Sequence, residues 1–308
     1  MSASDLLATE MRAVLDRLAT EDGPQPDPTL LPPAEGRAVA EASNRRWNRE
    51  GPVMARELIV ETADGRRAYV YIPKGDSGVQ AILYIHGGGW SYCSAATHDG
   101  AARWLADAAG APVVTFDYRL APEHRYPAGL EDCLSVWAGR EGILPGRIWS
   151  VSGDSAGANL AMAMMLRLDG RDLPQSGLLF YGVYDADFDS PSYRAIAEGP
   201  GLTRDKMRRY WDFYTGPDAD RLADPGLTPA NAPDAALAAL PSLYLNAAEI
   251  DPLCSDSERL AARLHALGRK DRFDLIAGVV HGFMQMSLWL PQSVDAYRRA
   301  GDAFRDIT

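Results

Sequence analysis

Short apolar runs alternate with longer amphipathic segments along the chain from about residue 58 onward. Several runs are continuously apolar, as expected for strands buried on both faces of a parallel sheet. Helical patterns such as 101–109, 130–138 and 158–168 lie between them. The predicted strands number eight: 57–61, 67–73, 81–85, 112–117, 147–152, 177–183, 242–247 and 273–276. This alternation predicts an α/β fold with a mostly parallel eight-stranded sheet flanked by helices.

Two regions depart from this alternation. Residues 1–50 predict two helices, 3–18 and 33–47, on either side of a proline-rich stretch. Residues 186–232 contain an aromatic helical pattern bounded by glycine and proline. We expect both regions to form a helical cap over the carboxyl edge of the sheet, where ligands of open α/β sheets bind, with residues 51–185 and 233–308 as the core. The alternative is that the N-terminal helices pack on the back of the sheet.

Composition narrows the classes of partner. The chain has 308 residues and a formal net charge of −11, which disfavours nucleic acid and anionic membrane surfaces because both are negatively charged. No apolar stretch reaches the roughly 18 residues that a membrane span needs, and no signal-peptide pattern is present. The three cysteines, Cys93, Cys133 and Cys254, have neither disulfide-framework nor zinc-site spacing. We therefore expect a cytoplasmic protein that acts on a small molecule and binds no metal. If the protein self-associates, we expect a homodimer.

Two glycine-rich segments follow predicted strands and indicate acyl-transfer chemistry. Residues 153–157 read G-D-S-A-G, the form of a nucleophile elbow, in which a sharp strand-to-helix turn exposes Ser155. Residues 86–90 read H-G-G-G-W, a glycine run whose backbone N–H groups can approach a developing negative oxygen. Taken singly, the first could be a flexible loop and the second an ordinary tight turn. Their joint occurrence after two strands favours an active site.

A serine hydroxyl needs a histidine base, and five histidines are available. We expect His86 to fix the glycine loop by hydrogen bonds. His98 and His124 lie in loops before the serine, and His265 lies in a helical pattern on a solvated face. His281 directly follows the last predicted strand and is therefore the predicted base.

The carboxylate that orients the histidine should lie between serine and histidine in the chain. Asp251 fits best, because it follows the strand 242–247 and precedes Pro252, which holds it on a short turn. Asp256 is the runner-up, although at the start of a helix it is better explained as a first-turn or capping carboxylate. Glu249 lies close by in the sequence and is a third candidate.

These segments together resemble the bacterial hormone-sensitive-lipase family of α/β-hydrolases. The H-G-G-G and G-D-S-A-G blocks are joined by D-P-L at 251–253 and H-G-F at 281–283. The resemblance continues through D-Y-R-L-A-P-E-H at 117–124 and T-H-D at 97–99. It extends from about residue 55 to the C-terminus, and the N-terminal segment shows no family pattern.

The resemblance implies an α/β-hydrolase fold and carboxylesterase activity without a cofactor. It assigns Ser155 as nucleophile, His281 as general base and then acid, and Asp251 as the orienting carboxylate. The implied oxyanion hole consists of the backbone N–H groups of Gly87, Gly88 and Ala156. Within the family the chain looks closest to acetyl esterases, through the segments 153–158, 181–184 and 251–253.

Large aromatic residues flank the predicted site and bear on substrate size. We expect Trp90 and Tyr184 to bind substrate and, with Tyr92, to shorten the cavity so that small acyl groups are favoured. The alternative is that Trp90 packs the loop against the cap and never touches substrate. The same triad can also cleave amides, lactones or carbamates. A non-catalytic ligand-binding protein on this fold is the competing class, although the retained Ser155, Asp251 and His281 disfavour it.

Overall fold

The computed structural model describes residues 3–168, 170–216 and 222–308. Within these residues, eight strands form one sheet in the order β1-β2-β4-β3-β5-β6-β7-β8. The β1–β2 and β2–β4 pairs are antiparallel and the other pairs are parallel, which confirms the mostly parallel sheet. The strands are β1 (Arg56–Glu61), β2 (Arg67–Ile72), β3 (Gln80–Ile85), β4 (Val113–Phe116), β5 (Ile148–Asp154), β6 (Ser176–Phe180), β7 (Ser242–Ile250) and β8 (Arg272–Val280).

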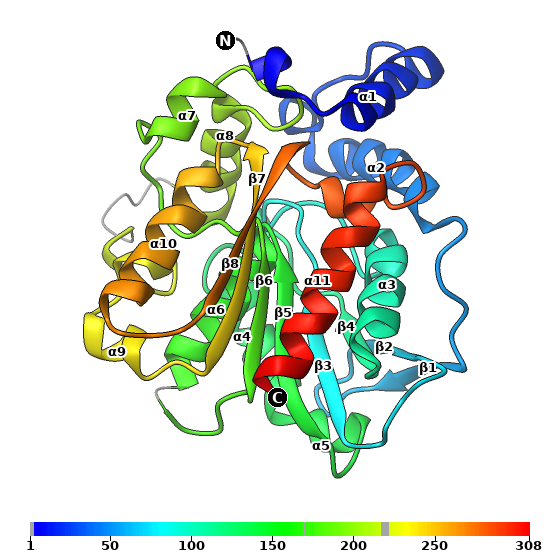
Figure 1. Cartoon of the computed structure of the whole chain (residues 1–308), viewed down its shortest axis with the longest axis vertical. Coiled ribbons are helices and arrows are strands. Elements are labelled where there is room, and N and C mark those ends of the chain that lie inside the picture. The colour runs from blue at the N-terminus through cyan, green and yellow to red at the C-terminus, as the bar shows by residue number, and fades with distance from the viewer. Residues whose placement is uncertain (1–2, 169, 217–221) are drawn as a thin grey trace.

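Helices cover both faces of the sheet (Figure 1). α3 (Asp99–Ala109) and α11 (Pro291–Ile307) pack together on one face. α4 (Ala128–Ala138), α6 (Ala156–Leu168) and α10 (Cys254–Ala266) contribute to the apolar cluster on the other face, where the short helices α5 (Arg140–Ile143) and α9 (Asp234–Ala238) also lie. Two separate buried clusters, one on each side of the central strands, therefore hold the sheet in place.

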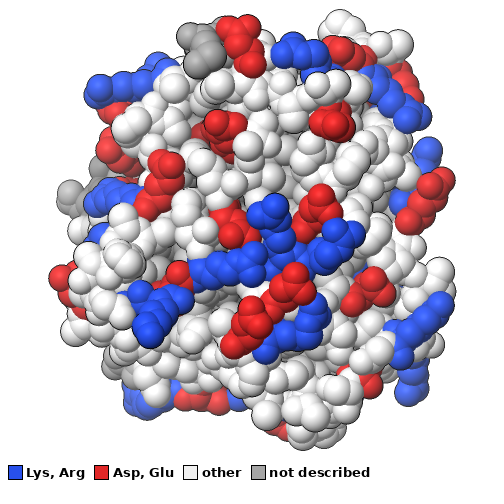
Figure 2. Space-filling model, viewed as in Figure 1, with Lys and Arg blue, Asp and Glu red and all other residues white. Residues whose placement is uncertain are grey.

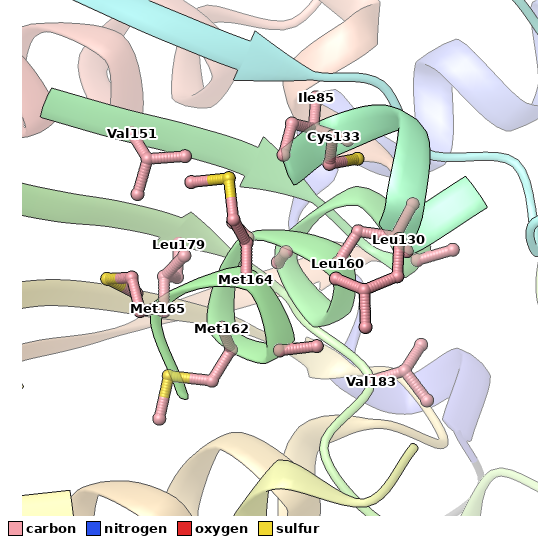
Figure 3. Packing of buried hydrophobic residues seen from close by; sticks show 14 of the residues in the cluster. Ile85, Leu130, Cys133, Val151, Leu160, Met162, Met164, Met165, Leu179 and Val183 are labelled. Carbon is pink, nitrogen blue, oxygen red and sulfur yellow. The ribbon is translucent and has the colours of Figure 1, made fainter. Parts of the chain in front are cut away.

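α6 is the most deeply buried helix near the predicted nucleophile. Its first ten residues, from Ala156 to Met165, are all buried. The small residues at its start allow close approach to the sheet, and its methionines belong to the apolar cluster on this face of the sheet. Figure 3 shows this cluster, which includes Leu160, Met164 and Met165 of α6, Leu130 and Cys133 of α4, and Val151 and Leu179 of the sheet. The helix that begins beside the predicted nucleophile is thus rigidly supported.

The N-terminal segment contains η1 (Ala3–Leu6), α1 (Thr9–Asp22), η2 (Pro28–Leu30), α2 (Pro33–Asn44) and η3 (Arg45–Asn48). The predicted continuous helix over 3–18 is wrong at its start. The N–H of Ala8 donates to the carbonyl of Gly278 at 2.9 Å, and this contact with β8 separates the η1 turn from α1. The predicted helix over 33–47 ends as α2 at Asn44 and continues as the η3 turn.

The second region outside the β–α alternation contributes α7 (Pro191–Ala195), α8 (Arg204–Thr215) and η6 (Pro229–Asn231). α8 coincides with the aromatic pattern in the sequence, whereas residues 217–221 of the expected cap insertion lie outside the described residues. Figure 1 shows α1, α2, α7 and α8 grouped above the carboxyl ends of the parallel strands. An ion pair joins the two regions, with Arg209 Nη2 of α8 lying 2.8 Å from Asp27 Oδ2 before η2.

Charges of both signs are interspersed on the face that carries α11 and α3 (Figure 2). On α11, Arg298 pairs with Asp295 at 2.5 Å and Arg305 with Asp302 at 2.6 Å. This face therefore presents no continuous surface of one sign. Among the helices of the described chain, none has the length and apolarity to cross a membrane.

Candidate active site

Ser155 lies on a strained turn between β5 and α6. Its backbone φ is +53°, a value that side-chain-bearing residues rarely adopt. Its N–H donates to the carbonyl of Phe180 at 2.9 Å, and its carbonyl accepts from the N–H of Val183 at 3.3 Å. The turn also requires glycine at position 157, because a Cβ there would lie 2.0 Å from the carbonyl oxygen of Ile85. The G-x-S-x-G segment therefore forms a nucleophile elbow.

The predicted serine, histidine and aspartate meet at the carboxyl ends of three strands. His281 Nε2 lies 2.9 Å from Ser155 Oγ, and His281 Nδ1 lies 2.6 Å from Asp251 Oδ2. Asp251 directly follows β7, and His281 directly follows β8. Asp251 is fully buried, and its other oxygen accepts from the N–H of Leu253 at 2.9 Å. The hydrogen bond from Leu253 therefore fixes the orientation of the carboxylate that contacts the imidazole.

Neither competing carboxylate contacts His281. Asp256 Oδ2 accepts from the N–H groups of Tyr184 and Asp185, both at 2.9 Å, in the first turn of α10. Burial raises the pKa of Asp256 to about 8, even though these two hydrogen bonds act in the opposite direction. Glu249 accepts from the N–H of Gly278 at 2.7 Å. Asp256 and Glu249 therefore bind backbone N–H groups near the site, and neither orients His281.

The hydrogen bonding of the glycine loop shows that one of the predicted oxyanion donors, Gly87, is wrong. The N–H of Gly87 donates to Asp154 Oδ1 at 2.9 Å and is therefore not free to bind a substrate oxygen. Gly88 and Gly89 both have positive φ, +114° and +57°, and their N–H groups donate to no acceptor in the described part of the chain. Ala156 is the first residue of α6, where the N–H has no acceptor within the helix. The available set is therefore Gly88, Gly89 and Ala156, and the sequence interpretation missed Gly89.

Asp154 connects the elbow to the glycine loop. This carboxylate is only 3% exposed. Besides the N–H of Gly87 it accepts from Tyr84 Oη at 2.7 Å, and its Oδ1 lies 3.4 Å from His98 Nε2. Burial by itself would raise the pKa of Asp154. The charge and hydrogen bond of His98, together with the hydrogen bonds from Tyr84 and the Gly87 N–H, outweigh burial and lower the pKa. Asp154 is therefore a buried carboxylate that anchors the loop.

His86 serves the loop as predicted from the sequence. Its Nδ1 lies 2.8 Å from the carbonyl of Gly87, and its ring stacks on Tyr118 with centroids 4.3 Å apart. Burial, followed by the charge of His98, lowers the pKa of His86 to about 4. The imidazole of His86 is therefore neutral near pH 7.

The two residues expected to bind substrate, Trp90 and Tyr184, are buried. Trp90 is 1% exposed, stacks on Tyr214 of α8 with centroids 4.4 Å apart, and donates to Asn159 Oδ1 at 3.3 Å. Tyr184 is fully buried, with Asp256 holding its backbone N–H. The contacts of Trp90 are those of the packing alternative. Neither side chain is placed to contact substrate, because cap packing encloses Trp90 and the interior of the core encloses Tyr184.

A different aromatic residue covers the glycine loop. A Cβ on Gly89 would lie 2.5 Å from the ring of Tyr210, so this α8 side chain lies directly against the loop. Tyr92, 2% exposed, packs edge-on against the same ring at 5.7 Å and donates to the carbonyl of Pro28 at 3.1 Å. The sequence interpretation missed Tyr210, although this residue belongs to the aromatic helical pattern found within residues 186–232.

In the residues that the structure describes, no group of three or more His, Cys, Asp or Glu side chains is arranged to hold a metal ion. The site is instead composed of a hydroxyl, an imidazole, a carboxylate and backbone amides. This set of groups is the one used in nucleophilic acyl transfer.

Comparisons with known proteins agree with the fold. Residues 82–285 match the family described as having the alpha/beta hydrolase fold. The chain is 35% identical over 291 residues to Carboxylesterase NlhH of Mycobacterium tuberculosis, a match covering 88% of this chain and 90% of that protein.

Solved structures of α/β-hydrolases and esterases are also similar to this chain. An α/β-hydrolase enzyme from the metagenome of Lake Arreo, Spain, is 30% identical with a TM-score of 0.89, and the match covers 98% of this chain and 99% of that one. A hyperthermophilic esterase from the archaeon Pyrobaculum calidifontis is 29% identical with a TM-score of 0.85, covering 98% of each chain. The chain therefore belongs to the α/β-hydrolase family, in the branch related to hormone-sensitive lipase. The resemblance seen in the sequence is confirmed.

Proposed function

We propose that this protein is a serine carboxylesterase that hydrolyses small esters with short acyl groups through an acyl-enzyme intermediate. The observation that carries the proposal is the continuous hydrogen-bonded line from Ser155 Oγ through His281 to Asp251, with separations of 2.9 and 2.6 Å. The names of its relatives, a carboxylesterase and a hyperthermophilic esterase, support the same reaction class.

In the first step His281 Nε2 takes the proton of Ser155 Oγ as the oxygen bonds to the ester carbonyl carbon. The carbonyl oxygen becomes negative and accepts hydrogen bonds from the N–H groups of Gly88, Gly89 and Ala156. The positive end of α6 favours the same charge. When the carbonyl re-forms, the bond to the alcohol oxygen breaks, and His281 gives that oxygen its proton. The products of this step are a free alcohol and an ester on Ser155.

In the second step a water molecule replaces Ser155 as the nucleophile. His281 removes one proton from the water as its oxygen attacks the acyl-enzyme, and returns the proton to Ser155 Oγ as the acid leaves. Asp251 accepts the Nδ1–H of His281 throughout, which leaves Nε2 unprotonated at the start of each step. The buried position of Asp251 keeps that tautomer fixed.

The preference for short acyl groups is supported by the enclosure of the nucleophile. Ser155 is only 7% exposed, and the ring of Tyr210 lies against Gly89 at the glycine loop. Because Tyr210 also packs on Tyr92, the ring cannot be displaced without disturbing the N-terminal segment. We expect this enclosure to leave little room for a long chain beside the reacting carbonyl.

A panel of p-nitrophenyl esters with acyl chains from two to about twelve carbons tests the proposal, with Ser155→Ala as the matched control. The expected result is the highest kcat/KM on the shortest chains and loss of activity in the variant. Activity that increases beyond about eight carbons would contradict the short-acyl preference. A matched amide that is cleaved faster than its ester would contradict the ester assignment itself.

A further inference from the structure

Tyr181 lies against the imidazole that the proposed mechanism uses as base. The ring centroids of Tyr181 and His281 are 5.1 Å apart, with an interplanar angle of 70°. The tyrosine is 1% exposed, so this contact belongs to the interior of the protein. Edge-to-face contacts at this separation are attractive and directional, and they restrain the orientation of both rings.

The backbone of Tyr181 is strained. Its φ is +36°, outside the range that bulky residues normally adopt. Its N–H is held twice by Asn246 of β7, by the carbonyl at 2.9 Å and by Oδ1 at 3.1 Å. Asn246 Nδ2 also lies 3.3 Å from the sulfur of Met284, three residues after His281. Such strain persists only where the surroundings hold the residue firmly, and here they hold the ring against the base, His281.

The segment that carries Tyr181 also fixes the nucleophile. Phe180, the residue before it, accepts from the N–H of Ser155, and Val183, two residues after it, donates to the carbonyl of Ser155. A single turn after β6 therefore sets the position of the elbow backbone and the position of a ring that touches His281. The relative placement of Ser155 and His281 depends on this turn.

The two hydrogen bonds of His281 do not fix its orientation completely. Ser155 and Asp251 fix the positions of Nε2 and Nδ1. The imidazole can still tilt about the line that joins those two atoms, and tilting weakens both hydrogen bonds. We propose that Tyr181 is a positioning residue whose ring holds the imidazole of His281 at the tilt that proton transfer with Ser155 requires. The proposal deepens the proposed function and rests on it.

Substitution of the ring tests this role. Tyr181→Leu removes the ring while keeping an unbranched Cβ, and kcat on p-nitrophenyl acetate should fall about 10- to 100-fold, as expected for a misplaced catalytic group. KM should stay within about twofold, because the buried tyrosine would act through His281 and not on bound substrate. Tyr181→Phe keeps the ring and should retain kcat within about threefold. Tyr181→Met is the second variant in case the leucine variant does not fold.

Two controls distinguish a positioning role of Tyr181 from a general loss of stability: a matched substitution elsewhere in the core, and the Tyr181 substitution made in a protein that lacks His281. Phe304→Leu changes a buried ring on α11 and should lower the melting temperature without lowering kcat. In the His281→Ala background, Tyr181→Leu should cause no further loss of residual activity, because the group that it positions is absent. Equal losses in both backgrounds, or a phenylalanine variant as impaired as the leucine variant, would overturn the proposal.

The proposed function and this inference can fail separately. If Ser155→Ala and His281→Ala retain wild-type activity, the proposed function is wrong. If both lose activity while folded Tyr181→Leu and Tyr181→Met keep kcat within about threefold of wild type, only the positioning role is wrong.

Discussion

The backbone N–H of Gly87 donates a 2.9 Å hydrogen bond to the carboxylate of Asp154. The first residue belongs to the glycine loop after β3, and the second directly precedes the nucleophile at the end of β5. One buried hydrogen bond thus joins the proposed oxyanion hole to the proposed nucleophile. It also occupies the N–H of Gly87, so the loop amides left without an acceptor in the described part of the chain are those of Gly88 and Gly89.

Removal of the Asp154 carboxylate should lower kcat more than it weakens substrate binding. In Asp154→Ala, the Gly87 N–H and Tyr84 hydroxyl lose their acceptor, so the loop should shift away from the elbow. We expect kcat to fall about 10²-fold or more, the size of effect seen when one oxyanion donor is lost. Asp76→Ala, which breaks the pair with Arg147 at 2.7 Å, is the control and should leave kcat unchanged. A folded Asp154→Ala with wild-type kcat would show that the loop does not need this anchor.

Substitution by asparagine should have different effects at Asp251 and Asp256, the two aspartates that follow β7. Asp251→Asn stabilises the wrong tautomer of His281, and kcat should fall about 10⁴-fold. Asp256→Asn preserves an oxygen that can accept from Tyr184 and Asp185, so kcat should change by only a few fold. Steady-state kinetics on one ester distinguishes the pair, and a larger loss in Asp256→Asn would refute the assignment of Asp251.

Asp256 should also make stability depend on pH. Its pKa is about 8 in the folded protein because of burial, and about 3.9 in an unfolded chain. Between these values the folded state keeps a proton that unfolding releases, so the free energy of unfolding decreases as pH rises toward 8. The full slope of one such group is about 1.4 kcal/mol per pH unit.

Urea titrations of wild type and Asp256→Asn at pH 5, 6.5 and 8 measure this contribution directly. The stability of the variant should fall less between pH 5 and pH 8 than that of wild type, because the amide does not titrate. Parallel pH dependences in the two proteins would mean that Asp256 is already ionised in the fold.

Ser155 and His281 should behave as one functional unit. Each single alanine variant should lose roughly 10⁴-fold or more in kcat, and the double variant should be little worse than either, because neither residue accelerates the reaction without the other. Circular dichroism should show the native fold in all three variants. Losses that multiply in the double variant would mean that the two side chains act independently.

The strands and the triad could be predicted because their signals are local. Each buried strand is a short apolar run between turn residues, and every predicted strand is present in the described chain. Asp251 and His281 follow strands whose carboxyl ends share one edge of the sheet, so the order serine, aspartate, histidine was enough to bring them together.

The errors occurred where tertiary contacts decide the outcome. Gly87 and Gly89 are indistinguishable in the H-G-G-G run, and only the position of the Asp154 side chain shows which amide is already bonded. For Trp90 the sequence allowed either substrate contact or packing against the cap, and the neighbours that decide for packing, Trp211 and Tyr214, come from a helix far along the chain. The start of α1 likewise depends on the contact of Ala8 with β8.

Covalent labelling gives the most direct test of the central claim, that Ser155 is an activated nucleophile in an esterase site. The intact protein would be incubated with a p-nitrophenyl alkylphosphonate, and the adduct located by peptide mass spectrometry. We predict one phosphonyl group per chain, on the peptide that contains Ser155, and no labelling of the His281→Ala variant on the same timescale. An unlabelled wild-type protein, or an adduct on another residue with Ser155 unmodified, would contradict the account.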